Sequence, residues 1–250
     1  MTLIYAHRGA NREAAENTRT AFDRALRYAI DGIETDVQLS RDEVCVLWHD
    51  RTLTRLGLPD KHIDDYGHAE LRAMDFSSWF AAGAQAEGIM SLEEFLAAYR
   101  QRCRLLIEIK NRDWEAVERH HIKVRQSLEA IGPGDSNAML ASSFDLESLV
   151  YAHEYRPDFP LVLNLEPEHH PAFAARILDA HPFLHGLCVS IDTLHEPMVD
   201  VVRSRGKGLA VYTCNSDDEI NTALELEVDI LISDVPHKAL LLRDRFMKKA

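Results

Sequence analysis

A regular alternation of short apolar segments with longer amphipathic segments restricts the fold of this chain more than any other feature. Through the second half, the apolar segments predict strands, and the segments between them have the spacing of amphipathic helices. The predicted strands are 105–109, 138–142, 161–165, 187–191, 209–213 and 230–233. The predicted helices are 113–130, 146–154, 171–180, 196–205, 217–227 and 236–245. Strands that alternate with helices in this way are typical of parallel βαβ units.

The N-terminal part of the chain adds two strands to this pattern. Residues 3–6 form a short apolar run, and residues 32–39 alternate apolar with acidic side chains, with a helix between them that Asn17 or Thr18 could cap. A further strand, 44–48, follows a short turn and predicts a hairpin. Without the hairpin strand, the count is eight βα units in 250 residues, as in a TIM (β/α)8 barrel. The alternative is an open doubly wound sheet, but no Gly-rich dinucleotide turn follows the first strand.

Residues 51–90 interrupt the alternation. They contain scattered glycines and aromatic residues with only short helical patterns, which predicts a small insertion after the second strand, within a single TIM-barrel domain that spans 1–250. Ser91 and Glu94 have the spacing of a capping box, so a helix resumes there. The insertion's aromatic side chains could form a lid over a substrate or a small separate core, and the sequence leaves both open; they are Phe76, Trp79 and Phe80.

The charge of the chain limits its partners. It has 28 Lys and Arg against 41 Asp and Glu, a net charge of −13, which argues against binding to nucleic acid or to an anionic membrane surface. No apolar run is long enough to insert in a membrane and the N-terminus lacks a signal peptide, so we expect a cytoplasmic protein. The cysteines are far apart, which predicts reduced thiols and neither a zinc knuckle nor a disulfide; they are Cys45, Cys103, Cys188 and Cys214.

Charged side chains collect where the predicted strands end. His7 and Arg8 follow the first strand and His49 follows the hairpin strand, while two strands carry the pairs Glu34 with Asp36 and Glu108 with Lys110. Each pair lies on one face of its strand because side chains alternate along a strand. In a barrel the carboxyl ends of the strands surround one mouth, where catalytic residues lie. Three carboxylates suit Mg²⁺ or Ca²⁺, two cations suit a phosphoryl group, and two imidazoles suit proton transfer.

Taken together, these motifs resemble the glycerophosphodiester phosphodiesterase family. The matching segments are AHRGANREAAENTRTAF, IETDVQLS, LWHD, LLIEIK, SSF, VYTCN and LISDVP, and they run from residue 4 to about 236. The resemblance implies a TIM barrel with an insertion after the second strand. It also implies that a divalent metal ion supports the hydrolysis of a small-molecule glycerophosphodiester to sn-glycerol 3-phosphate and an alcohol.

The resemblance also assigns roles to residues. His7 and His49 match the catalytic histidines. The metal ligands would be Glu34, Asp36 and Glu108, for Mg²⁺ or Ca²⁺ with Mn²⁺ as a further candidate. Binding of the phosphate would fall to Arg8 and Lys110, with Glu16 and Asn17 from the ENT motif supporting that site. Tyr212 stands where the family has Trp in a wall that faces the substrate, so the preferred alcohol is open.

Several alternatives remain at this point. The nucleophile could be the glycerol 2-hydroxyl, giving a cyclic phosphate, or metal-bound water. We expect His7 to be the base and His49 the acid, with the reverse assignment open. Other functions compatible with the residues are a phospholipase D-like enzyme acting on lysophospholipids or sphingolipids and a barrel that binds phosphate without catalysis. The sequence does not indicate an oligomeric state.

Overall fold

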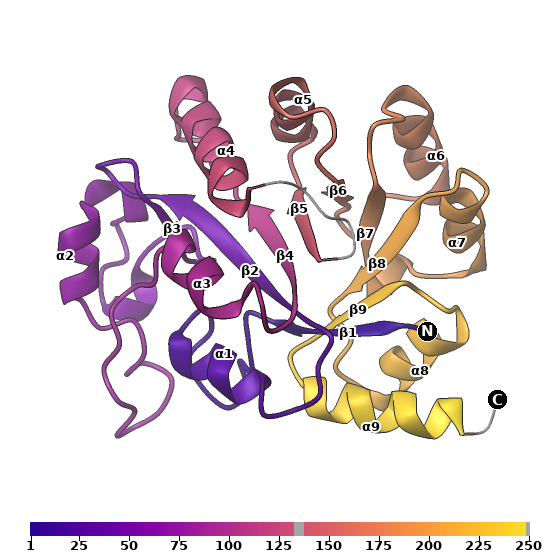
Figure 1. The fold of residues 1–250 in the computed structure, drawn as a ribbon, viewed down its shortest axis with the longest axis horizontal. Coiled ribbons are helices and arrows are strands. Elements are labelled where there is room, and N and C mark those ends of the chain that lie inside the picture. Colours follow the sequence, from indigo (N-terminus) through magenta and orange to yellow (C-terminus); the bar gives the residue numbers. More distant parts are fainter. Residues whose placement is uncertain (133–137, 249–250) are drawn as a thin grey trace.

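The strands of this chain close into a barrel (Figure 1). The structure is a computed structural model and describes residues 1–132 and 138–248. Within that range the parallel barrel strands are β1 (Leu3–His7), β2 (Gly32–Leu39), β4 (Arg104–Ile109), β5 (Met139–Ser143), β6 (Leu161–Asn164), β7 (Gly186–Ser190), β8 (Gly208–Tyr212) and β9 (Ile230–Ser233). β1 pairs with both β2 and β9, which closes the ring. The predicted TIM barrel is confirmed, and the open sheet is excluded because the eight parallel strands pair in a closed ring, whereas an open sheet ends in two edge strands.

Helices follow the strands and lie outside the ring (Figure 1). They are α1 (Arg19–Ala25), α3 (Leu92–Tyr99), α4 (Val117–Ile131), α5 (Leu146–Tyr155), α6 (Pro171–Ala180), α7 (Glu196–Arg203), α8 (Asp217–Glu225) and α9 (Pro236–Met247), with α2 (His68–Ala73) in the insertion. The predicted helix 113–130 begins four residues late, at Val117, because residues 113–116 form a turn instead. No helix among the described residues has both the length and the apolar character to cross a membrane.

One apolar layer lies outside the ring of strands and a second lies inside it. Side chains that point outward from the strands pack against the helices in the larger core. Side chains that point inward fill the lower part of the barrel; they are Tyr5, Leu106, Leu140, Val162, Cys188, Ala210, Ile230 and Ile232. All four cysteines are free thiols, and only Cys103 is partly exposed. Beyond the inner apolar layer, toward the carboxyl ends of the strands, the inward-pointing side chains include Glu34, Asp36 and Glu108.

The insertion packs on the hairpin strand β3 (Cys45–Leu47), which pairs antiparallel with β2. It contains two 3₁₀ turns, η1 (Thr54–Leu56) and η2 (Ile63–Asp65), besides α2, and lies to one side of the barrel (Figure 1, left). Its apolar side chains form a separate cluster with Val46 and Trp48 of the hairpin segment: Leu53, Ile63, Leu71, Phe76 and Ile89. Phe76 meets Trp48 edge to face, with ring centroids 5.2 Å apart. Phe76 therefore belongs to a separate core, while Trp79 remains partly exposed.

The turn after β1 requires glycine at position 9. Gly9 has a φ of +83°, and a Cβ there would lie 2.7 Å from the backbone carbonyl carbon of Ala21. We expect Gly9→Ala to lower the free energy of unfolding by about 3 kcal/mol, because strain and overlap add. Gly57 is the matched control, since it has a φ of +78° but open space around its Cβ position. Urea denaturation should show that Gly57→Ala lowers the free energy of unfolding by about 1 kcal/mol. Equal losses in Gly9→Ala and Gly57→Ala would contradict the role of the overlap with Ala21.

Candidate active site

The register of the sheet brings the predicted site residues together. His7 lies directly opposite Glu34 across β1 and β2, and Asp36 lies opposite Glu108 across β2 and β4. Lys110 follows β4 by one residue. All five side chains come from neighbouring strand ends, so the barrel itself fixes their relative positions.

The three acidic side chains of β2 and β4 form one buried cluster. One carboxylate oxygen from each of Glu34, Asp36 and Glu108 lies within 4.8 Å of the others. Burial, and next the charge of Asp36, raises the pKa of Glu34 well above its usual range. Carboxylates crowded in this way form an all-oxygen donor set, which fits a hard divalent cation such as Mg²⁺ or Ca²⁺.

Asp36 is the centre of the ionic contacts. Its Oδ1 lies 2.9 Å from Nζ of Lys110, and its Oδ2 lies 3.0 Å from Nε of Arg8. Burial alone would raise the pKa of Asp36, but the charges of Arg8 and Lys110 outweigh burial and hold the pKa well below its usual range. Lys110 also pairs with Glu108. Arg8 and Lys110 are thus held at the mouth by a carboxylate that is itself fully buried.

Asn17 supports Asp36 from the turn before α1. Its Nδ2 donates to Asp36 Oδ2 at 3.0 Å, and its Oδ1 accepts from Thr35 Oγ1 at 2.7 Å. The helix cap is Thr18, whose Oγ1 accepts from the amide of Ala21, so Asn17 is not needed there. Asn17 has a φ of +57°, which Asn tolerates better than most residues. The side chain therefore orients a carboxylate from a buried position.

His7 is oriented by Asp234, which directly follows β9. His7 Nδ1 lies 2.6 Å from Asp234 Oδ1, and Nε2 lies 3.9 Å from Glu34 Oε2. Asp234 is kept ionised, since its contacts with His7 and Asn11 outweigh burial and lower its pKa. The neutral His7 ring therefore donates from Nδ1 and leaves Nε2 as an acceptor. Burial, and next the charge of Arg8, lowers the pKa of His7.

The reasoning from sequence did not single out Asp234. It accepts from Asn11 Nδ2 at 2.6 Å, from Arg12 Nη2 at 2.9 Å and from Asn215 Nδ2 at 2.9 Å. Asp234 and Asn215 lie in the LISDVP and VYTCN segments, at or just after strand ends. This position could have identified both residues from the sequence, because polar residues that follow barrel strands face the site.

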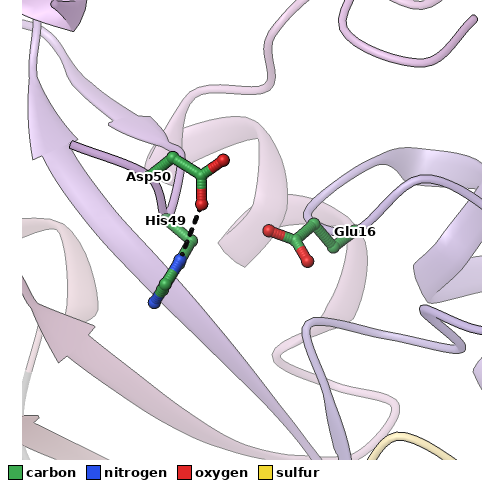
Figure 2. Close-up of side chains that lie close together, drawn as sticks. All are labelled: Glu16, His49 and Asp50. Carbon is green, nitrogen blue, oxygen red and sulfur yellow. Dashed lines mark hydrogen bonds and ion pairs between the residues drawn. The ribbon is translucent and has the colours of Figure 1, made fainter. Parts of the chain in front are cut away.

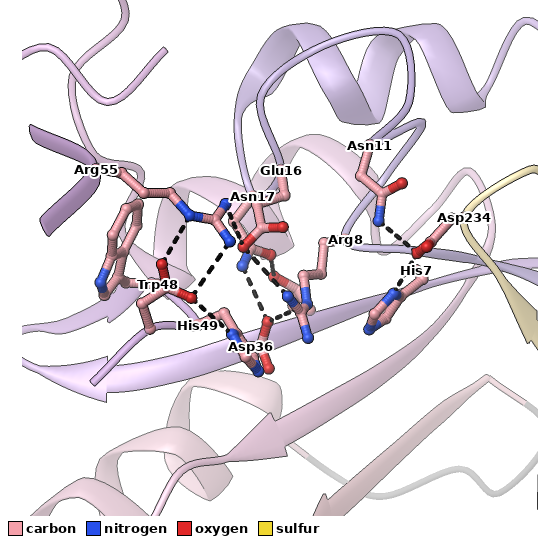
Figure 3. A network of polar contacts seen from close by, with 12 residues as sticks. His7, Arg8, Asn11, Glu16, Asn17, Asp36, Trp48, His49, Arg55 and Asp234 are labelled. Carbon is pink, nitrogen blue, oxygen red and sulfur yellow. Dashed lines mark hydrogen bonds and ion pairs between the residues drawn. The ribbon is translucent and has the colours of Figure 1, made fainter. Parts of the chain in front are cut away.

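A second chain of contacts runs from His49 to Arg8 through the insertion. His49 Nδ1 lies 3.0 Å from Asp50 Oδ1, and Asp50 Oδ2 accepts from Nε of Arg55 at 2.7 Å. The Oε1 of Glu16 lies 3.2 Å from Nη1 of both Arg55 and Arg8. Figure 2 shows Glu16 facing the His49–Asp50 pair, and Figure 3 shows the whole network. Glu16 thus contacts two guanidinium groups, an arrangement that orients Arg8.

A cavity of about 220 Å³ opens between the two histidines. It is lined by His7, Arg8, Glu34, His49, Glu108 and Lys110, with Leu106, Ser142, Phe144, Asn164, Cys188, Tyr212, Thr213 and Ile232. Tyr212 donates its hydroxyl to the carbonyl of Leu165 at 2.6 Å and meets Phe144 edge to face. His7 and His49 lie on either side of Arg8 and Asp36 (Figure 3). This arrangement can hold a small phosphorylated molecule between two proton-transfer groups.

A further hollow of about 600 Å³ adjoins this cavity on the His49 side. It shares His49, Glu108, Lys110 and Phe144 with the first cavity and is otherwise lined by Arg51, Ile109, Asn111, Arg112, Asp113, Asp145 and Glu166. A molecule that fills both hollows would pass beside His49 and Lys110, which line both.

Comparison with known proteins identifies the family of this chain. Residues 7–238 match the model of the glycerophosphoryl diester phosphodiesterase family. A glycerophosphodiester phosphodiesterase from Bacillus altitudinis is 32% identical over 98% of this chain and 99% of that protein. The structure of an Oleispira antarctica phosphodiesterase in complex with the product sn-glycerol-3-phosphate superposes with a TM-score of 0.86, is 26% identical and covers 98% of this chain and 97% of that one. A glycerophosphodiester phosphodiesterase from Agrobacterium tumefaciens has a TM-score of 0.78 and 26% identity, with 94% and 97% covered. This chain therefore belongs to the glycerophosphoryl diester phosphodiesterase family.

Proposed function

We propose that this protein hydrolyses glycerophosphodiesters to sn-glycerol 3-phosphate and an alcohol. The observation that carries the proposal is the pair His7 and His49 on either side of a cavity edged by Arg8 and Lys110. The family membership and the product bound in the Oleispira antarctica relative support it. A small-molecule substrate agrees with the size of the cavity, about 220 Å³, and a cytoplasmic location stays a prediction from the sequence.

The cationic side chains address the main difficulty of this reaction. A phosphodiester is a poor electrophile because its anionic oxygens repel a nucleophile. Arg8 and Lys110 would bind those oxygens and neutralise the charge that redistributes as the new bond forms. A divalent cation held by Glu34, Asp36 and Glu108 would add Lewis-acid neutralisation of the same charge. Glu16 and Asn17 would act through Arg8 and Asp36, since both contact those side chains.

The histidines would move the protons. As an oxygen nucleophile bonds to phosphorus, His7 Nε2 takes its proton; as the bond from phosphorus to the alcohol oxygen breaks, His49 gives that oxygen a proton. The location of the larger hollow on the His49 side supports this assignment, since an alcohol head group would occupy it. The nucleophile is either the glycerol 2-hydroxyl or water. Phosphorus NMR during turnover distinguishes them, because only the first gives a cyclic phosphate.

The test is release of sn-glycerol 3-phosphate from glycerophosphocholine and glycerophosphoethanolamine. We expect turnover with Mg²⁺, Ca²⁺ or Mn²⁺ and loss of turnover with a chelator. No product with any of these ions would refute the proposal, and would leave a barrel that binds phosphate without catalysis. Turnover of lysophosphatidylcholine or sphingomyelin alone would indicate a phospholipase D-like enzyme instead. Full activity in the chelator would remove the metal from the scheme.

Asp234→Asn tests the orientation of His7. The amide can no longer supply two ionised acceptor oxygens, so the Nδ1 proton of His7 is not fixed. We expect kcat to fall about 30-fold, within the range for a lost supporting hydrogen bond to a site residue. The matched control is Asp229→Asn. Asp229 directly precedes β9, whereas Asp234 directly follows it, and the carboxylate of Asp229 accepts from the amide of Leu209. Steady-state kinetics that found equal activity in Asp234→Asn and the wild type would contradict this role.

A further inference from the structure

We infer that Arg55, carried by the insertion, is a positioning residue that orients the acid histidine through Asp50 and also contacts Glu16, a partner of the phosphate-binding arginine. Its guanidinium contacts two carboxylates at once, Asp50 at 2.7 Å and Glu16 at 3.2 Å. Asp50 in turn contacts His49, and Glu16 contacts Arg8 (Figure 3). Arg55 is thus the group that joins the two sides of the site, and the inference rests on the proposed function.

The insertion fixes Arg55 from the opposite side. The guanidinium carbon of Arg55 lies 4.4 Å from the ring centroid of Trp79, within the range of a cation–π contact. Trp79 Nε1 donates to the carbonyl of Phe76 at 2.8 Å, and Phe76 is buried in the insertion's own core. The small core of residues 51–90 therefore acts as the support for Trp79, and Trp79 for Arg55.

The charges explain why an arginine lies here. Glu16, His49 and Asp50 bring donor atoms within 4.8 Å of one another, which by geometry alone would accommodate a cation (Figure 2). Both carboxylates already contact Arg55, and Glu16 also contacts Arg8. The guanidinium group of Arg55 therefore already supplies a positive charge between these two carboxylates. We assign the cation's place in this cluster to Arg55.

The consequences for the two sides differ. Arg8 has a second, fully buried partner in Asp36, so it stays oriented without Arg55. Asp50 and His49 are more exposed, with side chains 26% and 34% accessible, and Asp50 has Arg55 as its partner besides His49. Loss of Arg55 should therefore impair proton donation by His49 more than binding of the phosphate. In kinetic terms, kcat falls while KM changes little.

The experiment compares two substrates in the full-length enzyme. One is glycerophosphocholine, whose alkoxide leaving group needs a proton; the other is the p-nitrophenyl ester of glycerol 3-phosphate, whose leaving group is stable as the anion. For Arg55→Met we expect kcat to fall about 30-fold on the first and less than about threefold on the second. Arg55→Lys should recover part of the loss, because an ammonium group contacts one carboxylate well but not two.

Controls separate this effect from general damage. Arg72→Met removes another arginine–carboxylate pair of the insertion, with Glu94, and should leave both activities unchanged. In a double-mutant cycle, Asp50→Asn should lower kcat about as much as Arg55→Met, and the double variant should lose no more than either single one.

The outcomes are distinguishable. If the wild type turns over neither substrate, the proposed function fails. If the wild type is active and Arg55→Met loses equal activity on both substrates, or none on either, or loses it through KM alone, the inference about Arg55 is overturned. Additive losses in the double variant would also overturn it, because Arg55 would then not act through Asp50.

Discussion

His7→Ala is expected to lower kcat at least about a thousandfold on every glycerophosphodiester, whatever the leaving group. The reason is that each substrate needs its attacking oxygen deprotonated, and His7 Nε2 faces the cavity with Nδ1 engaged by Asp234. His49→Ala should be equally damaging on glycerophosphocholine. On the p-nitrophenyl ester of glycerol 3-phosphate it should cost only about tenfold, because that leaving group departs without a proton.

Parallel kcat measurements on the two substrates check this assignment. The matched control is His121→Ala, since the His121 ring stacks on Tyr151 between α4 and α5 and contacts nothing in the cavity lining. It should leave kcat unchanged on both substrates. If the nitrophenyl ester restores His7→Ala instead of His49→Ala, the acid and base roles are reversed. If the nitrophenyl ester restores the activity of both variants or of neither, the assignment of proton transfer to these two histidines is wrong.

Glu34→Gln is expected to trade activity for stability. Glu34 is buried beside Asp36, and burial together with the charge of Asp36 raises its pKa. A charged Glu34 therefore destabilises the metal-free protein, and a neutral side chain of the same shape removes that destabilisation. We expect the metal-free variant to gain about 1 kcal/mol. For a chain of this length that raises Tm by about 2–4 °C. Activity should fall at least about a hundredfold, because one ligand of the cation is weakened.

Thermal unfolding with chelator and with added Mg²⁺ tests both halves of this prediction. The wild type should gain Tm on addition of the ion, and Glu34→Gln should gain much less. Glu93→Gln on α3 is the control, because its carboxylate is exposed and far from the cavity lining. A Tm below that of the wild type in chelator would contradict the prediction, since Glu34 would then stabilise the fold without a metal.

The parts of the site that sequence predicted are those fixed by short-range regularities. Glu34 with Asp36, and Glu108 with Lys110, are two residues apart on strands, so the alternation of side chains already placed each pair on one face. The barrel rule then placed both faces at one mouth. The structure adds the register, in which Asp36 lies directly opposite Glu108.

The parts that were missed depend on contacts between distant segments. His7 and Asp234 are 227 residues apart, and they meet only because β9 pairs with β1. Arg55 lies in a segment without periodic pattern, where position follows from how a small core packs. The ENT motif predicted that Glu16 supports the site, but the sequence did not indicate that Glu16 contacts both Arg8 and Arg55. Propensity and spacing carry no information about such contacts.

The closure of the ring through β1 has a consequence for synthesis of the protein on the ribosome. β1 leaves the ribosome before the other strands of the barrel, yet one of its edges is covered by β9, which is the last of these strands to be translated. Until then that edge is exposed and available to pair with other chains, as unpaired strand edges are. A nascent chain that stops before residue 230 lacks both the cover for this edge and Asp234 beside His7. The pairing of β1 with β9 therefore closes the barrel, covers the exposed edge and brings Asp234 to His7 in a single event.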